Sequence, residues 1–128
     1  MKSILRNAKI APKKANLVAE LVRMKPVQDA IDTLRFTQKK AAKILKKVVE
    51  SAAANAETNF KQKKASLYIK EILVTTGTTY KRGVSISRGR VHPIRKTLSH
   101  ITVKLATNES PVKPEKTIKP KKQLTHGA

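Results

Sequence analysis

Apolar positions in the first third of the chain recur at helical spacing. Residues 12–25 open with a proline, which suits the first turn of a helix because no partner is lost there, and Pro26 marks the end of that helix. The apolar face predicted for this helix comprises Leu17, Val18, Leu21 and Val22. Residues 27–36 follow with i, i+3, i+4, i+7 spacing, which predicts a second, shorter helix. Its apolar positions are Val27, Ala30, Ile31 and Leu34.

A third and longer helical pattern covers residues 38–59, and Thr37 stands where a side chain could cap the helix. Its apolar stripe comprises Ala41, Leu45, Val48, Ala52 and Ala56. The opposite face carries Lys39, Lys40, Lys43, Lys46 and Lys47. The pattern predicts an amphipathic helix that buries an alanine-rich side and exposes a basic one.

Apolar and polar residues alternate instead in residues 67–77 and 99–107, which are rich in β-branched side chains and predict two strands. Two strands alone are marginally stable, so residues 1–10, a weaker strand pattern, are expected to add a third. The long helix then covers one face of the sheet, because its stripe and the strands' apolar sides both need partners. The prediction is an α+β fold in which three helices pack on a small antiparallel three-stranded sheet.

The chain is expected to form one domain and a tail. Its 128 residues suit a single domain, which we place at residues 1–109. Residues 110–128 contain three prolines and five lysines without periodicity, which predicts a disordered basic tail. The segment that joins the two later strands is far longer than an ordinary hairpin loop. A long, protruding basic β-hairpin is therefore expected at about residues 77–100.

The large positive charge of the chain indicates an anionic partner. Lys and Arg number 29 against 8 Asp and Glu, a net charge of +21, and self-repulsion on this scale favours a polyanionic partner. Nucleic acid and an anionic membrane both qualify, but no apolar run approaches the roughly 18 residues of a membrane span. The N-terminal apolar stretch is broken by Arg6 and Lys9, unlike a secretory signal. The absence of cysteine excludes disulfides and thiolate zinc sites and fits an intracellular protein.

The most concentrated basic segment is YKRGVSISRGRVHPIRK, residues 80–96, and residues 72–108 hold no acid. Its cations are Lys81, Arg82, Arg88, Arg90, Arg95 and Lys96. Arginine forks onto phosphates and stacks on bases, while Gly83 and Gly89 let the backbone approach a ligand closely. A ribbon this polar buries too little apolar surface to order itself against its own domain, so we predict that an outside partner holds it. A flexible, solvated loop is the alternative.

Further phosphate contacts are expected on the helices. The basic face of residues 38–59 meets no acid before Glu50, which is too few for balanced i, i+4 ion pairs. Phosphate contact is therefore preferred to a merely solvated face. Lys13 and Lys14 add side-chain charge to backbone N–H groups in the first turn of a helix, where anions are already favoured.

Catalysis is not expected. The three histidines, His92, His100 and His126, lack metal-ligand spacing, and neither a zinc motif nor a phosphate-binding glycine loop is present. His100 is expected to be structural or to contact RNA. The sequence therefore predicts a protein that is not an enzyme and that needs no cofactor or metal.

Five stretches, taken in order, resemble the bacterial-type ribosomal large-subunit protein 22 family. They are APKKANLVAELVR, TQKKAAKILKKVVESAAANAE, YIKEILV, GTTYKRGVSISRGRVHPIRK and SHITVKL, and the resemblance covers about residues 5–106. It implies a structural constituent of the large ribosomal subunit that binds 23S-type ribosomal RNA and supports assembly. It also implies a body near the exit of the nascent-peptide tunnel and a hairpin that lines the tunnel.

The same resemblance implies partners and site residues. The partners are several domains of large-subunit ribosomal RNA, neighbouring large-subunit proteins and the nascent peptide, in a cytoplasmic rather than organellar ribosome and without a membrane. Ribosomal RNA is expected to contact Lys13, Lys14, Lys39, Lys40, Lys43, Lys81, Arg82, Arg88, Gly89, Arg90, His92, Arg95, Lys96 and His100. The expected tunnel-lining residues are Lys81, Arg82, Gly83, Val84, Ser85, Ile86, Ser87 and Arg88. The chain departs from the family pattern at Ala11, Met24, Gln38 and in GVSIS, where the family has a more basic tip with proline.

Two other classes of protein remain open on the residues alone. A DNA-binding architectural protein also inserts basic β-arms into a groove, with an apolar wedge for which Pro93 is a candidate, and is usually dimeric. A membrane-active cationic protein needs an exposed helix with bulky apolar residues. The alanine-rich stripe of residues 38–59 matches that requirement poorly.

Overall fold

The computed structural model describes residues 1–107, and the predicted tail at residues 110–128 lies outside the described residues. The elements are β1 (Lys2–Ala8), α1 (Pro12–Val22), α2 (Val27–Phe36), α3 (Lys40–Phe60), β2 (Leu67–Ile86) and β3 (Arg90–Thr107). A short 3₁₀ turn lies at Lys64–Ser66, and Ser87–Gly89 form the turn between β2 and β3. The order β-α-α-α-β-β and the α+β class are confirmed.

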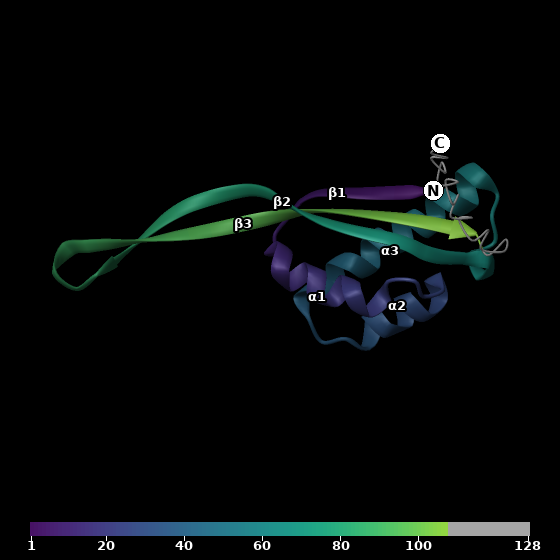
Figure 1. The fold of residues 1–128 in the computed structure, drawn as a ribbon, viewed down its shortest axis with the longest axis horizontal. Helices are drawn as coiled ribbons and strands as arrows, with labels where there is room; N and C mark the ends of the chain where they lie inside the picture. The colour runs from purple at the N-terminus through teal and green to yellow at the C-terminus, as the bar shows by residue number, and fades with distance from the viewer. Residues whose placement is uncertain (108–128) are drawn as a thin grey trace, which may run out of the picture.

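The three strands form an antiparallel sheet in the order β1-β3-β2, so the N-terminal segment adds the third strand as predicted. In the central strand β3, Ile101 pairs with Leu5 of β1 on one side and with Val74 of β2 on the other. Figure 1 shows the three helices on the same side of this sheet, with the β2–β3 hairpin running out beyond them. The helices therefore bury one face of the sheet, while the far half of the hairpin has no helix beside it.

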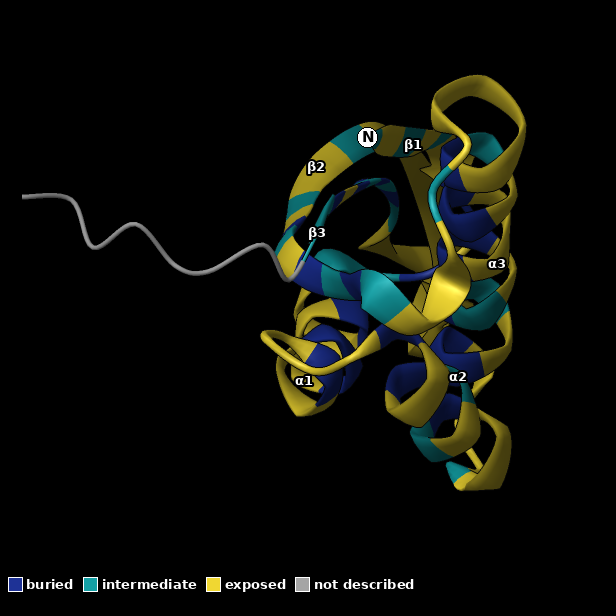
Figure 2. Cartoon of the chain, turned by 90° about the vertical axis from the view of Figure 1, so that its right-hand side faces the viewer, coloured by how far each residue is buried: buried dark blue, intermediate teal, exposed yellow. Residues whose placement is uncertain are grey.

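The core between helices and sheet is aliphatic apart from Ser99. The predicted stripe of α3 is confirmed, because all five of its positions from Ala41 to Ala56 are buried. The sheet contributes the buried side chains Leu67, Ile69, Ile72, Ile101, Val103 and Leu105. Figure 2 shows buried stretches of the ribbon on the helices and strands where they face one another, with exposed stretches on the outside. Small residues along α3 let its backbone approach its neighbours closely, which gives dense packing without large side chains.

The apolar face predicted for α1 is wrong in part. Leu17 and Leu21 are 68% and 51% exposed. The buried face of α1 comprises Ala15, Val18, Ala19 and Val22. Both sets recur at helical spacing, so spacing alone does not choose between them. The choice is made by close packing against the sheet and α3, where alanine fits and leucine does not.

The predicted end of α1 is also wrong. The helix ends at Val22 rather than near Lys25, and Met24 takes a left-handed φ of 62°. The N–H of Met24 donates to the carbonyl oxygen of Ile69 at 3.0 Å. The N–H of Ile69 donates to the carbonyl oxygen of Lys25 at 2.9 Å. The chain leaves the helix early because its backbone groups pair with β2.

Thr37 does not cap α3. That helix begins at Lys40, and its N-cap residue Lys39 makes no side-chain cap hydrogen bond. Thr37 instead closes α2, since its N–H and its Oγ1 both donate to the carbonyl oxygen of Thr33, at 3.1 and 2.7 Å. A threonine between two helices can cap the start of the second or the end of the first, and Thr37 caps the end of α2.

Candidate nucleic-acid interface

The β2–β3 hairpin continues past the body of the domain as a two-stranded ribbon, as predicted (Figure 1). Residues 79–86 pair with residues 90–97 without interruption, and residues 78–96 are all exposed. At the tip, Arg88 and Gly89 both take left-handed φ angles, of 61° and 73°. Glycine accepts this conformation without strain, which explains its place in the turn.

The pairing register distributes cations over both faces of the ribbon. Residues directly opposite each other in an antiparallel pair share a face, and successive pairs alternate between faces. One face carries the pairs Tyr80–Lys96, Arg82–Ile94, Val84–His92 and Ile86–Arg90. The other carries Lys81–Arg95, Gly83–Pro93 and Ser85–Val91. Positive charge on both faces suits enclosure by a polyanion better than contact with one flat surface.

No acid of the described residues offsets this charge. Asp and Glu are absent from residues 33–49 and 72–107. The ion pairs of the described part of the chain join Lys46 to Glu50, Lys64 to Glu57 and Lys104 to Glu71, at 3.6, 3.2 and 2.8 Å. The guanidinium of Arg82 lies over the ring of Tyr80, 5.4 Å from its centre, rather than against a carboxylate. The cations of the ribbon are thus available to an external anion.

A hydrogen-bonded cluster holds the base of the ribbon to the body. The N–H of Asn7 donates to His100 Nδ1 at 3.0 Å, and Asn7 Oδ1 accepts from the hydroxyl of Thr78 at 3.3 Å. Gly77 packs against these side chains, because a Cβ there would lie 3.0 Å from Asn7 Oδ1 and 3.2 Å from the His100 ring. His100 therefore makes a structural contact, one of its two predicted roles, and its contact with RNA stays a prediction.

Substitution of Asn7 should separate the contributions of its backbone conformation and of its side-chain acceptor to the stability of the fold. Asn7 has a left-handed φ of 53° and also supplies the acceptor for Thr78. We expect Asn7→Ala to lower the free energy of unfolding by about 1–2 kcal/mol, since alanine disfavours that φ and lacks the acceptor. Asn7→Gly should lose less, because glycine tolerates the φ. Urea denaturation of both variants measures the difference, and equal losses would show that backbone conformation contributes nothing here.

Lysines from the helices gather beside the base of the ribbon. A surface hollow of about 520 Å³ is lined by Lys9, Ile10, Ala11, Lys40, Tyr80, Lys96, Thr97 and Leu98. A second hollow, of about 380 Å³, shares Ile10 and Lys40 with the first and is also lined by Lys14 and Lys39. The structure therefore brings three predicted contact residues of the helices onto one surface with Lys96 of the ribbon.

Comparison with known proteins identifies the family. The family model described as Ribosomal protein L22p/L17e matches residues 3–106. The chain belongs to the ribosomal protein L22p/L17e family. It is also similar to the large ribosomal subunit protein uL22 of Fusobacterium nucleatum subsp. nucleatum, with 44% identity over 108 residues, which cover 84% of this chain and 97% of that protein. The resemblance drawn from the sequence is confirmed.

The remaining predicted contact residues of this L22p/L17e protein do not line these two hollows. Lys13 is exposed in the first turn of α1, and Lys43 is exposed on α3. His92 lies on the ribbon opposite Val84. Lys46, on the basic face of α3, is paired with Glu50. Whether each of the predicted residues touches RNA stays a prediction.

Sequence reasoning missed the residues that build the base of the ribbon. They are Asn7, Lys9, Gly77 and Thr78. Asn7 and Thr78 stand 71 positions apart and meet only because β1 and β2 flank β3. No local pattern indicates such a contact, although an isolated glycine inside a strand pattern, as at Gly77, is typical of a close approach.

The described residues also bear on the other classes of protein. Within residues 1–107, no group of three or more His, Asp or Glu side chains could hold a metal ion. No helix in the described part of the chain is long and apolar enough to cross a membrane. Pro93 pairs with Gly83 within the ribbon, whereas the tip is formed by Ser87–Gly89. A proline wedge at the tip, which the architectural DNA-binding reading invoked, does not match this position.

Proposed function

We propose that this member of the L22p/L17e family is a structural constituent of the large ribosomal subunit that binds 23S-type ribosomal RNA and supports subunit assembly. The observation that carries the proposal is the exposed ribbon of residues 78–96, which presents cations on both faces and has no acid beside it. Family membership supports ribosomal RNA as the polyanion. Residues 1–109 would act as one RNA-binding domain, with the hairpin at about residues 77–100.

RNA is the partner that the charge arrangement favours. Arginine planes stack on unpaired bases and fork onto phosphates, and folded RNA offers both on several sides of an inserted segment. The ribbon would contact RNA through Lys81, Arg82, Arg88, Gly89, Arg90, His92, Arg95 and Lys96. The body would contact it through Lys13, Lys14, Lys39, Lys40, Lys43 and His100. The cluster at Asn7 would set the angle at which the ribbon enters the RNA.

The tip of the ribbon is proposed to line the nascent-peptide exit tunnel, with the body near the tunnel exit. Residues 79–86 at about 3.3 Å each place the tip on the order of 25 Å beyond the base of the ribbon. This length supports a reach into the interior of a large particle. The tunnel-lining segment would be residues 81–88, in which Val84 and Ile86 are half exposed and could meet a passing chain.

Partners and location follow from the same proposal. The partners would be several domains of large-subunit ribosomal RNA, neighbouring large-subunit proteins and the nascent peptide. The location would be the cytoplasmic ribosome. Catalysis would belong to the RNA, and this chain would need neither a cofactor nor a metal.

Ultraviolet crosslinking in cells tests the proposal. The protein is purified under denaturing conditions after irradiation, the attached RNA is sequenced, and the attached residues are mapped by mass spectrometry. We expect crosslinks from residues 80–96 to large-subunit ribosomal RNA. Recovery of mainly DNA, or of scattered RNA without ribosomal enrichment, would favour the architectural class instead. Protein from cells that were not irradiated is the control.

A further inference from the structure

Within residues 1–107, strand β1 forms an edge of the sheet, and its outer backbone groups pair with no other described strand. It pairs with β3 on one side only, in the register Lys2–Lys104 to Leu5–Ile101. The N–H of Leu105 donates to the carbonyl oxygen of Met1 at 2.9 Å, so residues 1, 3 and 5 face β3 in this antiparallel ladder. The N–H and C=O groups of Lys2 and Ile4 then point away from β3. An exposed edge of this kind is a template for a further strand.

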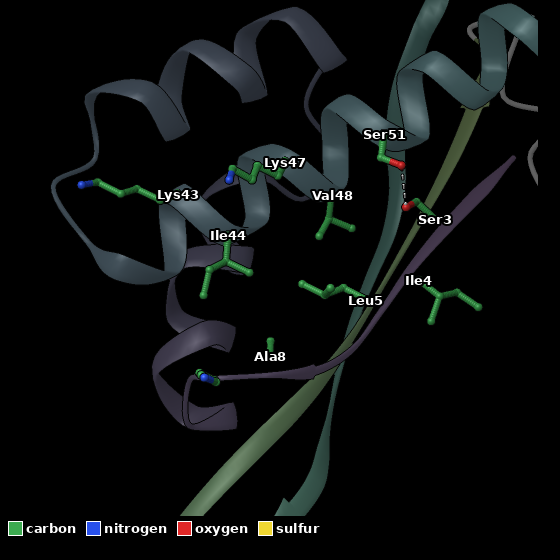
Figure 3. A pocket seen from close by; sticks show the side chains of 10 residues that line it. Ser3, Ile4, Leu5, Ala8, Lys43, Ile44, Lys47, Val48 and Ser51 are labelled. Carbon is green, nitrogen blue, oxygen red and sulfur yellow. Dashed lines mark hydrogen bonds between the residues drawn. The ribbon is translucent and has the colours of Figure 1, made fainter.

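An apolar hollow lies between this strand and α3. It has a volume of about 450 Å³ and is lined by Ser3, Ile4, Leu5, Ala8, Lys9, Lys43, Ile44, Lys47, Val48 and Ser51. Figure 3 shows Leu5 and Ala8 of β1 on one side of it and Ile44 and Val48 of α3 on the other. At one end, the hydroxyls of Ser3 and Ser51 are joined by a hydrogen bond of 3.4 Å. A side chain from a neighbouring strand would find apolar partners on both walls.

The rim of the hollow and the neighbouring edge carry positive charge. Lys9, Lys43 and Lys47 line the hollow, and no acid does. Lys2 and Arg6 are exposed on β1 itself. Side chains that stand opposite each other on paired strands lie on the same face, so an incoming strand would place alternate residues beside Lys2 and Arg6. Carboxylates at those positions, and apolar residues between them, would complement this surface.

We propose that the β1 edge and the adjoining hollow bind an extended segment of another protein, which adds a fourth strand with alternating apolar and acidic residues. A peptide backbone supplies donors and acceptors at the regular spacing of a strand edge, whereas RNA phosphates only accept and the RNA donors, its 2′-hydroxyls and bases, do not follow that spacing. The apolar walls likewise favour side chains over a nucleic-acid backbone. The chain's own residues 110–128 hold five lysines and one glutamate, which is not the alternating acidic pattern proposed for the partner. This interaction does not rest on the RNA contacts of the ribbon, and it shares only Lys43 with the RNA contacts proposed for the body.

Photo-crosslinking in the full-length protein tests the inference. The photoreactive residue p-benzoylphenylalanine is placed at position 44 in the hollow, cells are irradiated, and crosslinked peptides are identified by mass spectrometry. We expect one continuous segment of one protein, with the alternating pattern. Ile4→Pro should reduce the crosslinking yield at least tenfold, because it removes an outward N–H without touching the ladder to β3. The matched variant Ile4→Val keeps both that N–H and an apolar side chain, and it should leave the yield within twofold.

The stability of both Ile4 variants is measured by thermal denaturation. If Ile4→Pro unfolds the chain, Lys47→Glu replaces it, because Lys47 is exposed on α3 and a carboxylate there should repel the acidic partner and lower the yield severalfold. Crosslinks only to RNA, no crosslinked product, or a yield unchanged in the folded test variant would overturn the inference. Sedimentation of the tagged protein with large subunits is recorded separately, so a failure of ribosomal assembly is distinguished from a failure of strand addition.

Discussion

Replacing Lys81, Arg90 and Arg95 together by glutamine is expected to reduce the salt dependence of binding to large-subunit ribosomal RNA. The register places Arg90 on one face of the ribbon and the other two on the opposite face, so the variant removes charge from both. The slope of log K against log salt is negative, because binding releases counterions. Each lost phosphate contact reduces its magnitude by about 0.7 to 0.9. Three contacts then account for about 2 to 3 units of slope, together with weaker binding at every salt concentration.

The measurement is a series of equilibrium binding experiments with purified full-length protein and transcribed large-subunit ribosomal RNA at increasing potassium chloride. All three substitutions lie in exposed, regularly paired strand, so folding should be unaffected. A charge-matched control replaces Lys25, Lys63 and Lys70, which are exposed away from the ribbon. We expect the control to retain most of the slope. Equal flattening in both triple variants would mean that net charge, and not the ribbon, governs binding.

The second large effect concerns the core. Leu45→Ala is expected to lower the free energy of unfolding by about 2–5 kcal/mol, because it removes a buried side chain and leaves a cavity. Leu45 is fully buried in the apolar stripe of α3, in a core that has no aromatic side chain to compensate. For a small domain this is a large part of a total stability of roughly 5–15 kcal/mol. Urea denaturation followed by circular dichroism measures the loss.

Leu17→Ala is the matched control for this substitution. It makes the same chemical change in a helix, but at a side chain that is 68% exposed. The expected change is within about 0.5 kcal/mol, as for ordinary surface positions. The pair also distinguishes the two possible buried faces of α1. A loss at Leu17 as large as that at Leu45 would contradict the exposed position of Leu17.

The sequence by itself determined the kinds of elements, their order and the basic character of the hairpin. Residues 38–59 and 99–107 show why. Apolar residues at helical spacing share one face of a helix, whereas apolar residues in alternation share one face of a strand, so the local pattern indicates the type of element. The sequence also shows, without a structure, that no acid follows Glu71 in the described residues. The family resemblance supplied the expected site residues, whose individual contacts with RNA remain predictions.

Tertiary structure alone decided features that depend on distances between remote segments. It chose the alanine face of α1 over the leucine face, and it ended that helix early so that Met24 could bond Ile69. It joined Asn7 to Thr78 and His100 at the base of the ribbon. Strand register also placed the cations on both faces of the ribbon and left one edge of β1 unpaired among the described residues. The physical reason is that packing and backbone pairing select among local patterns that are equally satisfactory in isolation.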